Sequence, residues 1–146
     1  MFQDIHKDQI VSHFQNGNFE YIFNNFCKRN NNELIINYLY FKYLGNSNTY
    51  DLFVKIVLNH IDNILNEYET FNVHVSIKKL SIMEINKHID FIRNVSNLLK
   101  QKYQNQMNEC SIYNASNLFS QIYEIISPFI DKDTQEKIVI HKNCNT

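Results

Sequence analysis

The stretch Phe71-Asn72-Val73-His74-Val75-Ser76-Ile77 decides the class of fold, because apolar and polar side chains alternate along its whole length. Strict alternation predicts a β-strand with its two valines on one face. Ser81 and Glu84 follow with the spacing of a capping box, and they predict the start of a long helix that runs to about Tyr103. A strand followed at once by a long helix indicates an α/β protein.

Helical and extended patterns alternate along the rest of the chain as well. One or two short helices are predicted near the N-terminus with a break near Asn16-Gly17-Asn18, and Pro128 ends or kinks the last helix. This alternation predicts helices flanking a largely parallel sheet. We expect helices within 4–28, at 52–68 and at 117–128, strands within 34–44, at 110–114 and at 137–141, and a polar loop at 28–33.

The length and the charge of the chain limit the classes of function that it can have. The 146 residues suit a single domain over 1–146, and no linker or repeat divides them. Because 14 Lys and Arg stand against 15 Asp and Glu, we expect no nucleic acid partner. The first residues are charged, and apolar runs fall short of the roughly 18 residues of a membrane helix. We therefore expect a cytoplasmic protein with no signal peptide or transmembrane segment.

Cysteine content and residue bias add to this expectation. The odd number and wide spacing of Cys27, Cys110 and Cys144 favour reduced thiols inside the cell. Asn and Ile are abundant while Ala115 is the single alanine, which is typical of an AT-rich genome, cellular or viral. The asparagine clusters are therefore not interpreted as functional.

The sequence carries no motif for catalysis. Two glycines, Gly17 and Gly45, cannot build a dinucleotide or P-loop phosphate cradle, and no GxSxG elbow occurs. The six histidines lack the spacing of metal ligands. We therefore expect no enzyme, no cofactor and no metal site, and an enzyme without a visible motif stays a weaker hypothesis.

Four segments between Val73 and Asn143 resemble the motifs of one family in order and spacing. Residues 75–81, VSIKKLS, resemble "hydrophobic-Asp-Leu-Lys-Gly-hydrophobic-Ser", and residues 102–107, KYQNQM, resemble "Tyr-Tyr-Pro-Glu-Arg-Met". Residues 110–116, CSIYNAS, resemble "Tyr-Ile-Ile-Asn-Ala-Pro", and residues 118–138 resemble "Phe…Ile-Lys-Pro-Phe-Leu-Asp…Thr…Lys-Ile". From about Ile36 onward the chain thus resembles the CRAL-TRIO domains, the Sec14-like lipid-binding modules.

The resemblance implies a mixed sheet and a lipid-sized apolar pocket that is gated by the helix at about 117–128. It divides the chain into a short helical part (1–33) and a CRAL-TRIO-like core (34–146) that lacks the usual C-terminal extension. It also implies that Lys137 contacts a phosphate. The residues that it assigns to acyl chains are Leu118, Phe119, Ile122, Tyr123, Ile126 and Phe129.

The same residues have simpler interpretations. Apolar side chains at helical spacing are commonly core, and Lys137 at a strand start is commonly a solvated surface group. Several positions also depart from the family: Ser76 replaces its Asp, Lys79 its Gly, and Asn105 and Gln106 its Glu-Arg pair. No headgroup preference follows, and we expect a pocket that is reduced, open at one side, or completed by a second subunit.

Two functions remain open. The first is a small Sec14-like module that binds a hydrophobic ligand, a lipid, in an apolar pocket and meets membrane surfaces transiently. The alternative is a degenerate CRAL-TRIO-like module that binds a protein partner or a second copy of itself without lipid transfer. A cavity of a few hundred Å³ beneath residues 117–129 would favour the first.

Overall fold

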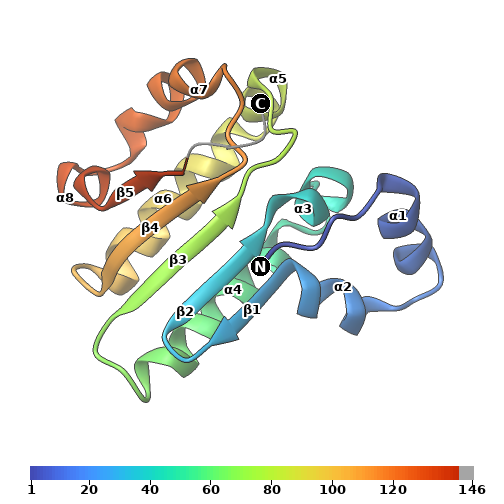
Figure 1. Ribbon diagram of the computed structural model, residues 1–146, viewed down its shortest axis with the longest axis horizontal. Helices are drawn as coiled ribbons and strands as arrows, with labels where there is room; N and C mark the ends of the chain where they lie inside the picture. The colour runs from blue at the N-terminus through green and yellow to red at the C-terminus, as the bar shows by residue number, and fades with distance from the viewer. Residues whose placement is uncertain (142–146) are drawn as a thin grey trace.

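A mixed, largely parallel sheet of five strands organises the computed structural model, which describes residues 1–141 (Figure 1). The strands lie in chain order, β1-β2-β3-β4-β5. The first two form an antiparallel hairpin, and each later strand pairs parallel with the one before it. The strands are β1 (Cys27–Asn30), β2 (Glu33–Asn37), β3 (Phe71–Ser76), β4 (Met107–Tyr113) and β5 (Ile138–Ile140).

Helices make every parallel connection of this sheet. Because such crossovers are right-handed and the strands are added in one direction, the crossover helices gather on one face of the sheet; Figure 1 shows α4 and α6 behind it. The helices are α1 (Lys7–Gln15), α2 (Phe19–Phe26), α3 (Tyr38–Leu44), α4 (Tyr50–Leu65), α5 (Ile82–Lys87), α6 (Ile89–Tyr103), α7 (Phe119–Ile126), the 3₁₀ turn η1 (Ser127–Phe129) and α8 (Lys132–Glu136).

The predicted α/β class with a largely parallel sheet is confirmed, and so are the strand at 71–77, the helix at 52–68 and the final strand. Ser81 caps α5 by accepting a hydrogen bond from the backbone N–H of Glu84 at 3.2 Å, as its spacing predicted. Gly17 stands between α1 and α2 with a φ of 74°, the left-handed conformation that glycine adopts without strain.

Residues 28–33 were wrongly predicted as a loop. Most of them form the β1–β2 hairpin, which turns at Asn31 with a φ of 56°. The sequence of β1 lacks the apolar alternation of a strand because β1 is an edge strand, and edge strands carry charged residues such as Lys28 and Arg29.

Two other predicted elements are divided in the structure. A strand does lie within 34–44, but only up to Asn37, whose side chain accepts a hydrogen bond from Leu39 and so begins α3. The long helix at 81–103 is broken at His88, which ends α5 and precedes α6. In both places apolar residues continue through the break, so their periodicity gives no signal of it.

Most of the buried apolar side chains belong to one cluster that joins α1–α4 to the sheet. Ile10, Ile22, Leu34, Tyr40 and Ile64 are each less than 2% exposed and belong to one hydrophobic cluster. Within residues 1–141, no helix combines the length and the apolar character that crossing a membrane requires.

Candidate functional site

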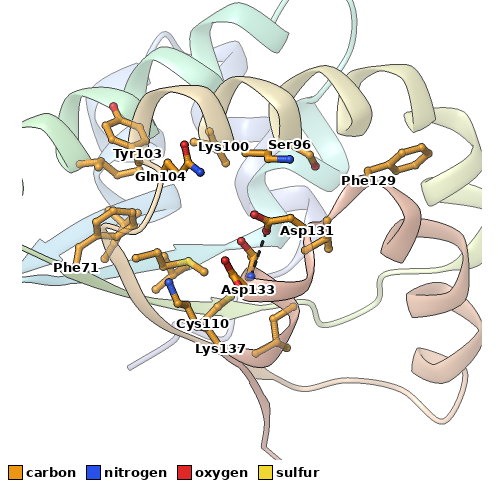
Figure 2. A pocket seen from close by; sticks show the side chains of 18 of the residues that line it. Phe71, Ser96, Lys100, Tyr103, Gln104, Cys110, Phe129, Asp131, Asp133 and Lys137 are labelled. Carbon is orange, nitrogen blue, oxygen red and sulfur yellow. Dashed lines mark hydrogen bonds between the residues drawn. The ribbon is translucent and has the colours of Figure 1, made fainter.

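A cavity of about 310 Å³ lies between the helical face of the sheet and the segment that connects β4 to β5 (Figure 2). Its floor follows from strand register. Leu34, Val73, Cys110 and Ile138 are direct partners across β2, β3, β4 and β5, so their side chains form one row on the same face. The floor is therefore almost entirely apolar.

Helices supply the walls. Ser96, Leu99 and Tyr103 are spaced three or four apart on α6, so they project from one side of that helix toward the sheet. Val57 and Ile61 of α4 add an aliphatic surface. Tyr103 is fixed in place because its hydroxyl donates to the Asp62 carboxylate at 2.6 Å.

The segment from α7 to α8 covers the cavity. Tyr123 and Ile126 line it from one face of α7, and Phe129 and Ile130 continue this lining after the helix ends. The Arg93 guanidinium of α6 lies 5.0 Å from the centre of the Phe129 ring, which is a cation–π contact between the wall and the cover.

Charged residues gather at one side of the cavity. Lys100, Lys137, Asp131 and Asp133 all line it, and Figure 2 shows Lys100 on α6 across from Asp131. Asp131 caps α8 by accepting a hydrogen bond from the backbone N–H of Thr134 at 3.2 Å. This hydrogen bond, with the charges of Lys100 and Lys137, lowers the pKa of Asp131. The polar side thus carries Lys100 on α6 and, on the α8 segment, Asp131, Asp133 and Lys137.

The lining has little capacity for covalent chemistry. Its one thiol is Cys110, whose pKa burial raises to about 11, so the thiol is protonated at neutral pH. No histidine is among the residues that line it. The nearest approach to a catalytic arrangement, His74 with Glu33 at 2.8 Å, lies on the opposite face of the sheet. In residues 1–141 no three metal-ligating side chains converge.

The structure separates the candidate residues of the sequence into two groups. Tyr123, Ile126, Phe129 and Lys137 line the cavity. Leu118, Phe119 and Ile122 are not among the lining residues: Ile122 is only 1% exposed, Leu118 is 48% exposed, and Phe119 packs on Tyr123.

Sequence reasoning missed the contribution of α6. It predicted a long helix that runs to about Tyr103, but it gave that helix no place in the pocket and gave Lys100 no role. No signal in the sequence pairs Lys100 with Lys137, because the two come together only through the crossover from β4 to β5. Cys144, the third cysteine, lies outside the described residues; Cys27 and Cys110 are free.

Comparison with known proteins decides the family. The sequence model of the CRAL/TRIO domain matches residues 20–146. The chain belongs to the CRAL/TRIO domain family. The match begins before Ile36, so it includes α2 from Glu20 onward and the β1–β2 hairpin, which the sequence resemblance had left out.

A solved structure shares this fold. The crystal structure of Sfh5 is similar with a TM-score of 0.64 and 17% sequence identity, over 74% of this chain and 41% of that one. At this identity the similarity describes the fold alone. Among curated proteins, none matches the sequence.

Proposed function

We propose that this CRAL/TRIO chain binds a hydrophobic ligand, a lipid, in the cavity between the sheet and the α7–α8 segment, and that it does no covalent chemistry. One observation carries the proposal: about 310 Å³ of space is lined mainly by aliphatic and aromatic side chains, with charged groups at one side only. This is the arrangement expected of a site for an apolar molecule with one polar end.

Burial of the apolar chain supplies the affinity in this proposal. Each methylene removed from water contributes about 0.8 kcal/mol, so about ten buried methylenes contribute about 8 kcal/mol. This offsets the lower part of the roughly 4–15 kcal/mol that association costs, and the headgroup contacts add to it. The floor residues Val73 and Ile138 take the apolar end. Lys137 pairs with an anionic headgroup, and Lys100 is close enough to the same aspartate to join it.

The gate in this proposal is the helix at about 117–128, with Phe129 beyond it. Tyr123, Ile126 and Phe129 contact the ligand from above, and the exposed Leu118 and half-buried Phe119 contact the membrane, whereas Ile122, which is 1% exposed, holds the helix against the protein interior. The exposed Leu118 supports transient contact with a membrane surface during exchange. The buried free thiol of Cys27 supports a reducing, cytoplasmic location.

A second candidate function is a protein-binding module. Val139 and Ile140 are 39% and 41% exposed on β5, the edge strand of the sheet, and an apolar edge strand can pair with another chain or a second copy. An open apolar cavity favours the lipid proposal over this one.

Lipid uptake from vesicles tests the proposal. Purified protein is incubated with vesicles of phosphatidylcholine and phosphatidic acid, separated from them, and weighed intact by native mass spectrometry. We expect one lipid for each chain. A chain that carries no lipid on purification and takes none from the vesicles would contradict the proposal.

Two adjacent substitutions give a matched pair for this test. Ile138→Trp places a large ring in the cavity, whereas Val139→Trp, one residue later on β5, projects from the opposite face. We expect Ile138→Trp to abolish uptake and Val139→Trp to retain it. Circular dichroism confirms that both variants are folded.

A further inference from the structure

Two segments leave the carboxyl edge of the sheet side by side. Because β3 and β4 are parallel neighbours, the segments that follow them begin at the same edge, and the Ile77 N–H donates to the Tyr113 carbonyl at 3.0 Å. The first segment continues into α5 and the second into α7, and these two helices pack against each other (Figure 1). Together they form what we call the carboxyl-edge surface, with an α5 segment (77–87) and an α7 segment (114–121).

The carboxyl-edge surface is basic although the chain as a whole is not. Its α5 segment carries three lysines against one carboxylate and its α7 segment carries no charge, whereas the formal net charge of the chain is −1. Lys78 shares its charge with Asp4 at 3.2 Å. Lys79 and Lys87 are exposed, and neither forms an ion pair in the part of the chain that the structure describes. These two lysines are therefore available to an anionic partner.

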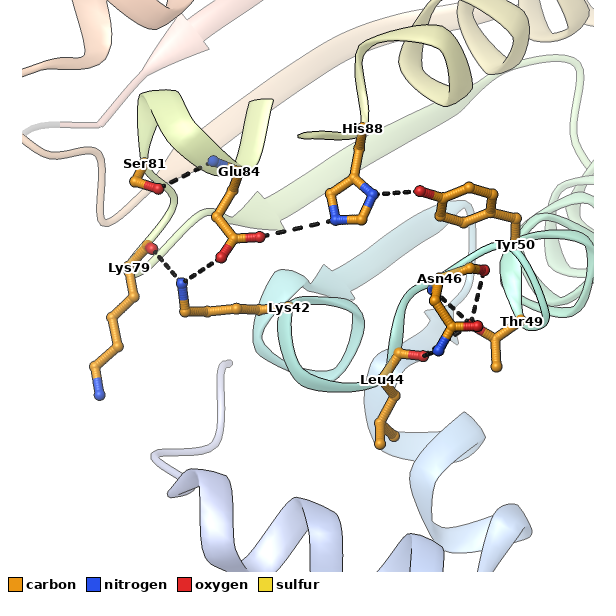
Figure 3. A network of polar contacts seen from close by, with 9 residues as sticks. All are labelled: Lys42, Leu44, Asn46, Thr49, Tyr50, Lys79, Ser81, Glu84 and His88. Atoms are coloured by element: carbon orange, nitrogen blue, oxygen red, sulfur yellow. Dashed lines mark hydrogen bonds and ion pairs between the residues drawn. The ribbon is translucent and has the colours of Figure 1, made fainter. Parts of the chain in front are cut away.

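A network of hydrogen bonds holds the α5 segment in place (Figure 3). The Lys42 ammonium of α3 donates to the Lys79 carbonyl at 3.1 Å and to the Glu84 carboxylate at 3.4 Å. The Ser81 hydroxyl accepts from the Glu84 N–H and caps α5. Figure 3 shows the Lys79 side chain pointing away from this network. The one carboxylate of the segment is thus already paired with Lys42, which leaves the Lys79 charge for the surroundings of the protein.

Two large apolar side chains stand on the same surface. Met83 is 80% exposed and Leu118 is 48% exposed. Met83 precedes Lys87 by four residues on α5, so these two side chains lie on one side of that helix. Leu118 is the N-cap residue of α7, where the cover of the cavity begins. Both apolar side chains would gain free energy in an environment less polar than water.

A membrane suits this surface better than a protein partner does. Binding sites between proteins depend on tryptophan, tyrosine and arginine side chains in closely packed pockets. The two segments contain none of these residue types, and their one aromatic residue, Phe119, is half-buried and packs on Tyr123. Separate apolar side chains flanked by lysines instead match the boundary between acyl chains and anionic headgroups in a bilayer.

We propose that the carboxyl-edge surface docks the protein on an anionic phospholipid membrane, with the apolar side chains of Met83 and Leu118 inserted and its lysines on the headgroups. Because the surface includes the start of α7, docking brings the cover of the cavity against the bilayer. The consequence for ligand exchange rests on the proposed function, whereas docking itself does not.

A single tryptophan tests the surface directly, because the chain contains none. Met83→Trp places this reporter on the carboxyl-edge surface. Tyr68→Trp is the matched control: Tyr68 is 38% exposed and lies between α4 and β3, at the opposite edge of the sheet. Each full-length variant is mixed with vesicles of phosphatidylcholine, alone or with phosphatidylserine, whose acyl chains carry bromine as a quencher. We expect anionic vesicles to quench the fluorescence of Met83→Trp and to leave that of Tyr68→Trp unchanged.

Removing the two unpaired lysines measures their contribution by vesicle sedimentation. Lys79→Asn, which tolerates the φ of 66°, is combined with Lys87→Gln. Each lysine near an anionic surface contributes about fivefold in affinity, so the pair should weaken binding about 25-fold. Lys102→Gln with Lys132→Gln is the matched control, because it removes the same charge where α6 ends and α8 begins, at the opposite edge of the sheet. This control should bind vesicles like the parent.

Equal quenching of the two reporters, quenching of neither, or the same loss of binding in both lysine pairs would overturn the proposal. A Met83→Trp spectrum that changes with protein concentration and not with vesicles would also overturn it, because the surface would then bind a second copy. Sedimentation of the unsubstituted chain needs no variant to fold: binding that does not depend on phosphatidylserine contradicts the proposal. If the chain docks as expected but takes up no lipid, the proposed function fails and docking stands. If it takes up lipid without this docking, only the docking proposal fails.

Discussion

The two halves of the helical layer are packed in opposite ways. Between α1–α3 and the first turn of α4 the side chains pack closely: Phe26 meets Phe53 at 4.7 Å between ring centres, and Phe53 meets Phe41 at 5.3 Å. Under α6–α8, Tyr123 and Ile126 are only partly buried and border a cavity of about 310 Å³. The contrast suggests that the first half supplies most of the folding free energy, which leaves the second half free to exchange its contents.

The largest expected loss of stability comes from a substitution in the closely packed half. Ile22→Ala removes a side chain that is 1% exposed and leaves a cavity, so the free energy of unfolding should fall by about 2–5 kcal/mol. Ile126→Ala removes a group that already borders empty space, and it should cost about 1 kcal/mol. Urea unfolding measures both, and equal losses would show that the halves do not differ.

The reactivity of two thiols gives a second comparison of the halves, because Cys27 belongs to the hydrophobic cluster and Cys110 lines the cavity. Burial raises the pKa of Cys27 to about 12 and that of Cys110 to about 11. In a Cys144→Ser background, Cys110 should react with a small disulfide reagent faster than Cys27, because Cys110 lines the cavity whereas Cys27 is 0% exposed. Bound lipid should protect Cys110. Faster reaction of Cys27, or no protection of Cys110 by lipid, would contradict the difference in packing between the two halves.

Lys79 replaces a glycine of the family but keeps a backbone conformation that favours glycine. The family has glycine at this position, and Lys79 adopts a φ of 66°, which costs free energy for any residue with a Cβ. Lys79→Gly should therefore raise the free energy of unfolding by about 0.5–1 kcal/mol, after the larger entropy of the unfolded glycine chain is subtracted. Lys78→Gly, which has no such strain to relieve, should lower it; thermal unfolding of the two variants distinguishes these outcomes.

The smallest expected effect comes from a contact that holds the α7–α8 segment over the cavity. Arg93→Ala removes the guanidinium above Phe129, and an exposed cation–π contact is worth about 0.5–1 kcal/mol. We expect lipid to leave about two- to fivefold faster, with little change in global stability. Arg93→Lys keeps the positive charge and should lie between the two. An unchanged rate of lipid release in Arg93→Ala would mean that Phe129 does not hold the cover closed.

The sequence predicted the fold better than the site. Strict alternation at 71–77 and the capping spacing of Ser81 and Glu84 are local signals, and both correspond to observed elements. The edge strand β1 escaped prediction because Lys28 and Arg29 obscure its period. The break at His88 escaped because the periodicity of α5 continues into α6.

The site was harder because it depends on distant contacts. The helix at 117–128 could be identified as apolar, but which of its residues face the cavity depends on its rotation above the sheet: Ile126 lines the cavity and Ile122 does not. Lys100 and Lys137 line the same cavity only because the crossover from β4 to β5 returns the chain beside α6. Strand register aligned Val73 with Cys110 and Ile138, and no pattern within one strand specifies that register.

Diffraction from crystals grown with a terminally brominated fatty acid tests the central claim most directly, because bromine gives an anomalous signal at its own position. The account predicts one bromine site between the sheet and α7, within contact of Val73 and Cys110, and its loss in Ile138→Trp. A bromine signal only on the outer surface, or a solid interior where the cavity should be, would contradict the account.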